Sequence, residues 1–218
     1  DIRGIGVHCN VGNEKDIEEL ILHTEERVGP IDLFCSNAGI ITLGGIAVSD
    51  DQWQRIWEIN VLSHIRVGRI LIPRMIERGG GSLMITASAA GLLSQIGSVP
   101  YSATKHAAIG LAESLAITYG NQGIRIFALC PQAVRSDMTR HHEGGGVAAV
   151  DGLMEPDQLA EAVMQGFRRE TFLILPHPEV ATYMQRKSAD HDPWRQGMRR
   201  LQARYHDGAP LKKQDPNS

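Results

Sequence analysis

Three side chains that can move a proton stand near the middle of the chain. Tyr101 and Lys105 are four residues apart, so on a helix they share one face, about one turn apart. A free phenol has a pKa near ~10 and is a poor acid or base at neutral pH, but a nearby ammonium favours the phenolate and lowers that pKa. Ser88 precedes Tyr101 by 13 residues and can place a hydroxyl beside it. This set suits proton transfer to or from a carbonyl or alcohol oxygen.

The elements that must position these side chains follow an alternating pattern. Short apolar runs predict strands at residues 5–9, 31–35, 83–86, 124–129 and 172–175. Helical spacing predicts helices at residues 14–28, 51–78, 101–119 and 156–169. Pro73 should kink or shorten the second of these helices. Strand–helix repeats imply right-handed crossovers and a doubly wound, mostly parallel sheet with helices on both faces, which is a Rossmann-like α/β fold.

Ligands of such sheets bind outside the carboxyl ends of the strands. The loops expected at this edge are residues 10–12, 36–39, 86–91 and 131–138. Cys9, Cys35 and Cys130 also lie at strand ends, where we expect small buried apolar residues rather than a thiol cluster.

Four motifs in order resemble the short-chain dehydrogenase/reductase family. Residues 36–39, Ser-Asn-Ala-Gly, are similar to the family's Asn-Ala-Gly turn, and Asn60 is similar to its catalytic asparagine. Residues 88–91 are similar to its catalytic serine segment, and residues 101–105 to its YxxxK motif. Residues 131–138 match in part. The resemblance runs from residue 1 to about residue 175.

The resemblance implies an oxidoreductase that transfers a hydride between NAD or NADP and a secondary alcohol or ketone. Tyr101 would be the general acid/base, Lys105 would lower its pKa and hold the nicotinamide ribose, and Ser88 would orient the substrate oxygen. Asn60 would hold a water that links Lys105 to solvent; alternatively, it is a buried asparagine that holds a helix bulge. Packing or capping roles are the alternatives for Ser88 and Tyr101.

The resemblance also implies a set of cofactor contacts. These residues are Asn10, Val11, Asn37, Ala38, Gly39, Tyr101, Lys105, Val134 and Ser136. The first two would flank the adenine, the Asn-Ala-Gly turn would pass close to the adenosine ribose, and the last two would meet the nicotinamide carboxamide. A plain helix cap is the alternative for Ser136.

The sequence departs from the family at four places. Ser36 stands where asparagine is common, and Asn10 where aspartate is usual. Gln132 replaces the glycine expected after Pro131 and should alter the loop that faces the nicotinamide, because glycine permits positive φ. The fourth departure is the family's Gly-rich turn for the pyrophosphate, which this sequence does not supply. A chain that starts here should expose apolar strand flanks and bind dinucleotide poorly.

A substrate pocket is expected from residues 92–99, residues 42–46 and the aperiodic loop at residues 139–155. The first segment contributes Leu92, Leu93, Ile96 and Val99, which favour a hydrophobic ketone or alcohol. His141, His142 and His177 lack metal-ligand spacing, so no metal is expected.

A length of 218 residues favours one globular domain, or one domain with an appendage. We predict a partial dinucleotide-binding and catalytic domain at residues 1–185 and a basic extension at residues 186–218. A net charge of -3 disfavours nucleic acid as the main partner. The extension is expected to be a solvated helix that packs Trp194, Met198 and Leu201 on the body or on a neighbouring subunit, although a nucleic-acid tail is conceivable.

Cellular context follows from what the sequence lacks. Three widely spaced cysteines are no disulfide framework, and residues 1–6 begin no secretory signal. With no apolar run of about 18 residues, we expect a cytoplasmic protein without a membrane span. The family resemblance implies a small-molecule partner and a homodimer or homotetramer. The competing hypothesis is a non-catalytic binding or regulatory protein that kept the fold.

Overall fold

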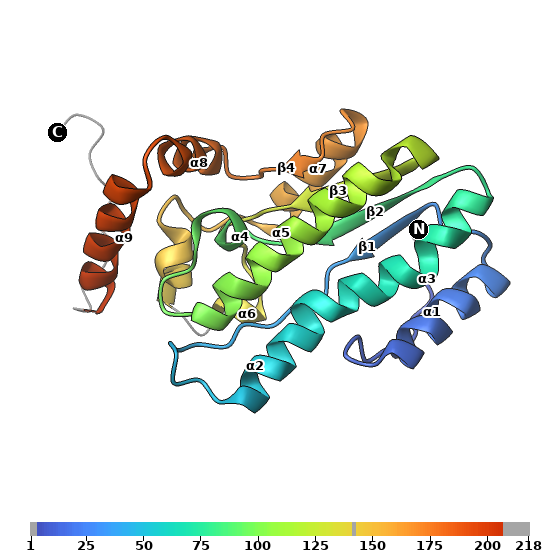
Figure 1. Cartoon of the computed structure of the whole chain (residues 1–218), viewed down its shortest axis with the longest axis horizontal. Helices are drawn as coiled ribbons and strands as arrows, with labels where there is room; N and C mark the ends of the chain where they lie inside the picture. The colour runs from blue at the N-terminus through green and yellow to red at the C-terminus, as the bar shows by residue number, and fades with distance from the viewer. Residues whose placement is uncertain (1–3, 141–142, 207–218) are drawn as a thin grey trace.

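The computed structural model describes residues 4–140 and 143–206. Within them, a four-stranded parallel sheet runs in the order β1-β2-β3-β4 (Figure 1). The strands are β1 (Leu33–Ser36), β2 (Gly81–Thr86), β3 (Ile124–Leu129) and β4 (Leu173–Ile174). The parallel order with helical crossovers confirms the predicted Rossmann-like α/β class.

The α-helices of the described residues include three that begin and end within two residues of the bounds predicted at 14–28, 101–119 and 156–169, and others that the sequence did not predict. They are α1 (Glu14–Arg27), α2 (Asp50–Trp57), α3 (Ser63–Glu77), α4 (Ala90–Leu93), α5 (Val99–Tyr119), α6 (Asp137–Arg140), α7 (Pro156–Arg168), α8 (Glu179–Ala189) and α9 (His191–His206). The Asn13 side chain caps α1 by accepting from the amide of Lys15, and Ser98 caps α5 by accepting from the amide of Tyr101. Gly123, with φ 81°, ends the segment after α5 in the left-handed region.

Side-chain alternation along the strands divides the core between two faces. Leu83 and Ile85 of β2 lie in the cluster that includes residues of α1, α3 and α5. Met84, between them, packs with β3, β4 and α7 on the opposite face. Figure 1 shows α3 and α5 lying along one side of the sheet. Burying a Leu or Ile side chain contributes about 1.5–3 kcal/mol, so this alternation fixes the register of the central strands.

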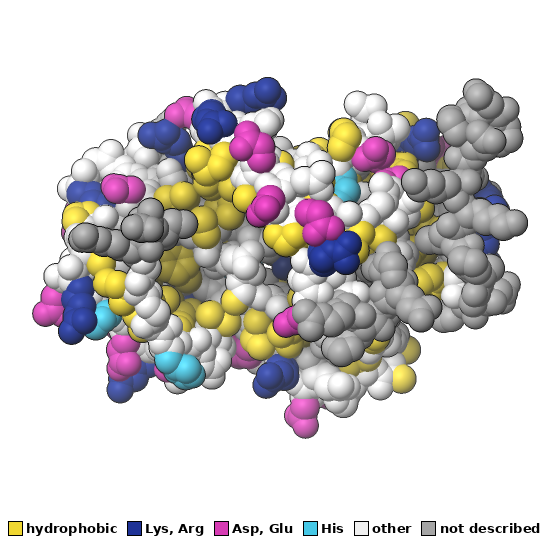
Figure 2. Space-filling view, turned by 180° about the vertical axis from the view of Figure 1, so that it is seen from behind, with side chains coloured by type: hydrophobic (Ala, Val, Ile, Leu, Met, Phe, Trp, Pro, Cys, Tyr) yellow, Lys and Arg dark blue, Asp and Glu magenta, His cyan; other side chains and the backbone are white. Residues whose placement is uncertain are grey.

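The predicted strand at residues 5–9 is wrong. A strand needs a hydrogen-bonded neighbour, and in residues 4–140 and 143–206 no strand runs beside this segment. Ile5 and Val7 are instead exposed. Figure 2 shows hydrophobic side chains in a hollow on the face opposite that of Figure 1.

The three cysteines differ in burial, which corrects the expectation that all are buried. Cys130 is buried and Cys9 half-buried, but Cys35 is exposed. Cys35 lies on the edge strand β1, whereas α7 packs over residues of β2, β3 and β4. Among residues 4–140 and 143–206, the sheet face beside Cys35 therefore lacks the cover that the central strands have.

The long helix predicted at residues 51–78 is interrupted. A π-helical turn, Glu58–Leu62, separates α2 from α3. Pro73 does not shorten the helix, because α3 continues to Glu77. Single π-turns within helices often mark functional sites, and this one carries Asn60.

Candidate active site

Helix α5 places the predicted tyrosine and lysine on one buried face. Tyr101 is 9% exposed and Lys105 is 3% exposed. The Lys105 Nζ lies 5.6 Å from the centroid of the Tyr101 ring and donates a 2.9 Å hydrogen bond to the carbonyl oxygen of Thr86. Thr86 is the last residue of β2, so the lysine joins the carboxyl end of this strand to helix α5.

Ser88 reaches this group through the close packing of α4 on α5. Its Oγ accepts from the amide of Ala90 at 3.1 Å and lies 3.4 Å from the carbonyl oxygen of Pro131. A Cβ on Gly91 would lie 2.4 Å from the backbone oxygen of Lys105, so glycine permits this approach. Ser88 and Tyr101 consequently line the same cavity.

Burial dominates the electrostatics of the site. It raises the pKa of Tyr101, and the Ser88 hydroxyl acts in the opposite direction by hydrogen bonding. Burial lowers the pKa of Lys105 to about 8. It also raises the pKa of Cys130 to about 12, which keeps that thiol neutral beside the lysine. Lys105 is therefore a costly buried cation that still carries its proton at neutral pH.

The Asn60 side chain forms hydrogen bonds with the backbone of the residue that follows the Asn-Ala-Gly turn. Its Oδ1 accepts from the amide of Ile40 at 2.9 Å, and its Nδ2 donates to the Ile40 carbonyl at 2.9 Å and to the Thr104 hydroxyl at 3.2 Å. The side chain is fully buried within the π-helical turn. These contacts favour the bulge-holding role, and the water relay stays a prediction.

The Asn-Ala-Gly turn lies against the same lysine. A Cβ on Gly39 would lie 3.4 Å from the Lys105 Nζ and 3.5 Å from the Asn60 Oδ1, while Asn37 and Ala38 are exposed. Thr86 takes one of the three ammonium donors of Lys105. The remaining donors, beside a glycine that brings no side chain against the ammonium, fit the hydroxyls of a nicotinamide ribose.

Sequence reasoning missed His64. Its Nδ1 lies 2.6 Å from the Oγ of Ser36, and both residues are buried. Burial lowers the pKa of His64 to about 3, with a smaller contribution from the charge of Lys105. A neutral histidine thus holds the first residue of the turn, and serine in place of the family's usual asparagine was the one signal of this pairing.

Hydrogen bonds to residues further along the chain hold the loop that follows β3. The amide of Gln132 donates to the Nδ1 of His177 at 3.2 Å, and its side-chain Nε2 donates to Asp151 at 3.0 Å. Gln132 is not among the residues with positive φ, so its side chain is accommodated without left-handed strain. Thr139 Oγ1 donates to the Val134 carbonyl at 2.9 Å.

The remaining predicted cofactor residues lie on loops. Ser136 is exposed and its amide donates to the Thr139 hydroxyl at 3.0 Å. Asn10 Oδ1 accepts from the amide of Gly12 at 3.1 Å, and Val11 packs against the core. The contacts predicted between these residues, Val134 and a dinucleotide stay predictions.

A cavity of about 990 Å³ opens at the Ser88–Tyr101 end of the sheet. Its walls include Leu93 and Ile96 from the predicted first segment and Leu43 from the second. The predicted loop contributes Thr139, Gly146, Val147, Ala148 and Val150. Leu92 and Val99, expected in the pocket, are not among its lining residues.

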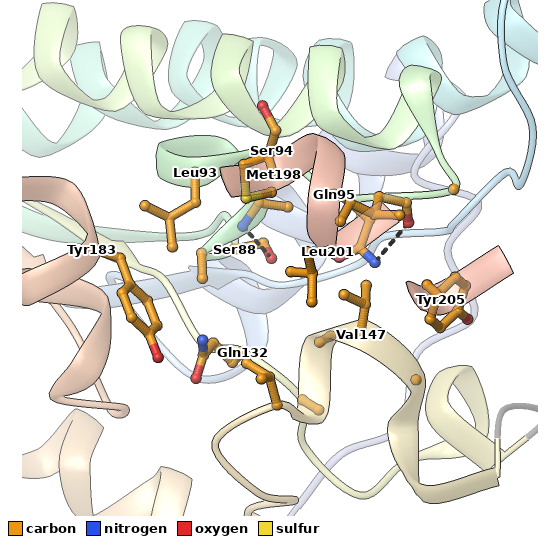
Figure 3. A pocket seen from close by; sticks show the side chains of 18 of the residues that line it. Ser88, Leu93, Ser94, Gln95, Gln132, Val147, Tyr183, Met198, Leu201 and Tyr205 are labelled. Carbon is orange, nitrogen blue, oxygen red and sulfur yellow. Dashed lines mark hydrogen bonds between the residues drawn. The ribbon is translucent and has the colours of Figure 1, made fainter. Parts of the chain in front are cut away.

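Helices α8 and α9 form a wall of the cavity that the sequence did not predict. Tyr183, Met198, Leu201 and Tyr205 line it (Figure 3). Trp194 is a further lining residue. Trp194 also packs with the buried cluster of Ala89, Leu93 and Val180. The cavity thus draws on both sides of the boundary predicted at residues 185 and 186, and that division stays a prediction.

The described part of the chain contains no group of three or more His, Cys, Asp or Glu residues placed to hold a metal ion, and His141 and His142 lie outside it. None of its helices combines the length and hydropathy needed to cross a bilayer.

The sequence is similar to a family model and to curated proteins. A family model described as short chain dehydrogenase matches residues 2–144. The 1-deoxy-11-beta-hydroxypentalenate dehydrogenase of Streptomyces avermitilis is 28% identical over 183 residues, covering 82% of this chain and 67% of that protein. A Mycobacterium tuberculosis protein named an uncharacterized NAD-dependent oxidoreductase is 32% identical over 131 residues, covering 59% of this chain and 48% of that protein.

The fold is also similar to that of solved structures. The apo form of LigO from Sphingobium sp. strain SYK-6 superimposes with a TM-score of 0.72 at 27% identity, covering 94% of this chain and 77% of that one. By length, the chain spans about half to two thirds of the two curated relatives above.

Proposed function

This chain belongs to the short chain dehydrogenase family, and we propose that it transfers a hydride between NAD or NADP and a secondary alcohol or ketone. The observation that carries the proposal is the buried group of Ser88, Tyr101 and Lys105 at one end of a 990 Å³ cavity. A scaffold that only binds partners has no need of a buried lysine beside a buried phenol, since each costs desolvation free energy.

In the proposed reaction, Tyr101 exchanges a proton with the substrate oxygen. During reduction its hydroxyl protonates the oxygen of the former carbonyl, and during oxidation its phenolate takes the alcohol proton. Ser88 donates to the same oxygen and fixes its position between the two hydroxyls. The nicotinamide, when bound, supplies or accepts the hydride at the substrate carbon.

Lys105 serves the tyrosine in two ways. Its ammonium, 5.6 Å from the ring centroid, would favour the phenolate form of Tyr101 against the burial that raises the pKa of that hydroxyl. Its free N–H donors hold the ribose hydroxyls, and Gly39 leaves room for that contact. We further propose that Asn37 and Ala38 border the adenosine ribose.

The outer cofactor contacts are part of the same proposal. Val134 and Ser136 would meet the carboxamide, and Asn10 and Val11 would flank the adenine. Their support is their position in the chain: Asn10 and Val11 lie just before α1, and Val134 and Ser136 lie on the loop between β3 and α6.

Isotope transfer tests this function. The purified protein is incubated with the neutral aryl ketones propiophenone and deoxybenzoin and with NADH or NADPH deuterated at C4 on either face. We expect deuterium at the carbinol carbon of the alcohol product, measured by mass spectrometry. Suppose that the protein binds the dinucleotide but neither ketone gives a deuterated alcohol, whichever face of the nicotinamide carries the deuterium. That result would contradict the proposal and favour the non-catalytic binding protein.

We also propose a reducing, cytoplasmic setting and a homodimer or homotetramer. The free cysteines Cys9, Cys35 and Cys130 support the first. Exposed Ile117 and Val99 on α5 support the second, since exposed apolar side chains on a long helix suit a subunit interface. Analytical ultracentrifugation of the purified protein measures the assembly directly.

A further inference from the structure

Helix α9 presents two different stripes to the cavity. Trp194, Met198, Leu201 and Tyr205 recur at helical spacing and form an apolar and aromatic wall. Figure 3 shows Met198, Leu201 and Tyr205 of this wall. Arg200 and Arg204, four residues apart and therefore on one face, border the same cavity and are exposed. One helix thus supplies both an apolar surface and a pair of cations to one binding space.

These two arginines are unpaired in residues 4–140 and 143–206. Neither takes part in an ion pair or a hydrogen bond with another side chain there, whereas Arg195 on the same helix pairs with Asp192. An unpaired guanidinium keeps all its donors available in a planar fork that matches a carboxylate in bidentate geometry.

The rest of the lining does not neutralise this charge. Asp190 is the acidic side chain among the described lining residues, and its carboxylate accepts from the amide of Asp192. Asp151, next to the lining residue Val150, is engaged by Gln132 and by the Tyr183 hydroxyl, at 3.0 Å and 2.9 Å. Arg186 adds a further cation near the Tyr183 ring. The cavity therefore has a hydroxyl-lined end, an apolar body and a cationic border.

We propose that the substrates are bulky aryl ketones or secondary alcohols that carry a carboxylate remote from the reacting oxygen. The oxygen would meet Ser88 and Tyr101, the aromatic body would lie against Trp194, and the carboxylate would bind Arg200 and Arg204. This inference rests on the proposed hydride transfer and adds its substrate class. A cavity of 990 Å³ lies at the upper end of small-molecule sites, which agrees with a bulky ligand.

A series of matched probes tests the inference. The probes are 4-benzoylbutyrate, 6-oxo-6-phenylhexanoate and 8-oxo-8-phenyloctanoate, each compared with its primary amide, so that charge is varied at constant shape and the span to the arginines is sampled. For at least one length, we expect kcat/KM for the carboxylate to exceed that for the amide by roughly tenfold, as charge-assisted hydrogen bonds would give.

Variants of the α9 arginines test whether these side chains cause the carboxylate preference. The double variant Arg200→Gln, Arg204→Gln should lose the carboxylate preference, so that kcat/KM for each carboxylate falls to about that of its amide. Arg199→Gln is the matched control, because Arg199 is an exposed arginine of the same helix that does not line the cavity. Circular dichroism of each variant checks that the total helix content of the protein is unchanged.

The outcomes separate the two proposals. Turnover of the amides with no carboxylate preference, or a preference that the double variant retains, would overturn the inference and leave hydride transfer standing. If no probe is turned over, calorimetric binding of the same pairs decides: tighter carboxylate binding that the double variant abolishes supports the arginine site, and equal affinities overturn it.

Discussion

The ammonium nitrogen of Lys105 lies 5.6 Å from the centre of the Tyr101 ring, and both side chains are buried. Holding a cation there costs free energy, which appears in the lowered pKa of Lys105, about 8. The 2.9 Å hydrogen bond to Thr86 offsets part of that cost. Lys105 therefore affects both the free energy of unfolding and the proposed proton transfer by Tyr101. Its titration can be measured without a substrate.

Lys105→Met should remove a pH dependence from the stability of the protein. Between pH 8 and 10.5 the unfolded chain still holds the lysine proton while the folded protein has released it, so the unfolded state binds more protons and stability rises with pH. Relative to Lys105→Met, the wild-type protein should gain up to roughly 3 kcal/mol in the free energy of unfolding between pH 7 and 10.5.

Urea unfolding at a series of pH values measures this difference. Lys15→Met, at an exposed lysine of α1, is the control and should follow the wild-type profile. Parallel stability profiles for the wild type and Lys105→Met would show that Lys105 is not desolvated.

His64 should make the protein sensitive to acid. Below pH 6.5 the unfolded chain protonates this histidine, but the folded protein, with a pKa of about 3, does not, so stability falls as the pH falls. Lowering the pH from 7.5 to 5 should cost the wild type about 2 kcal/mol more than it costs His64→Leu.

Denaturant unfolding at the two pH values tests this, with the exposed His8→Leu as the comparison. A loss of stability in His64→Leu as large as in the wild type would mean that His64 titrates normally in the folded state.

Gly91→Ala should damage both stability and the site. The new Cβ would lie 2.4 Å from the Lys105 backbone oxygen, a contact that a backbone cannot relieve cheaply, so we expect a loss of about 1–3 kcal/mol. Gly110→Ala, in α5 with no atom within 4 Å of the added Cβ, should instead gain about 0.5–1 kcal/mol. Equal thermal midpoints for the two variants would contradict the close packing of α4 on α5.

The sequence predicted the residues whose relationship is local. Tyr101 and Lys105 lie one helical turn apart wherever α5 packs, and β3 begins and ends at the predicted residues because Gly123 and the apolar run define it. The family resemblance that these motifs carried is confirmed by the match over residues 2–144.

Features that depend on distant partners were not predictable from pattern alone. Residues 5–9 have strand composition but no neighbouring strand within the described chain. The apolar stripe of α9 predicts a packed face without saying which surface receives it, so Met198 and Leu201 were not expected in the cavity wall. The pairing of Ser36 with His64 spans 28 residues and leaves no periodic signal.

The turnover and dinucleotide affinity of Tyr101→Phe test the central claim most directly. Removing the phenolic hydroxyl leaves the ring, the lysine and the Gly39 turn in place. Turnover should therefore fall by about 10²–10⁴, the usual contribution of a positioned general acid or base, while the Kd for NAD or NADP stays within about twofold. Unchanged turnover, or turnover lost only in proportion to dinucleotide binding, would show that Tyr101 does not transfer the proton.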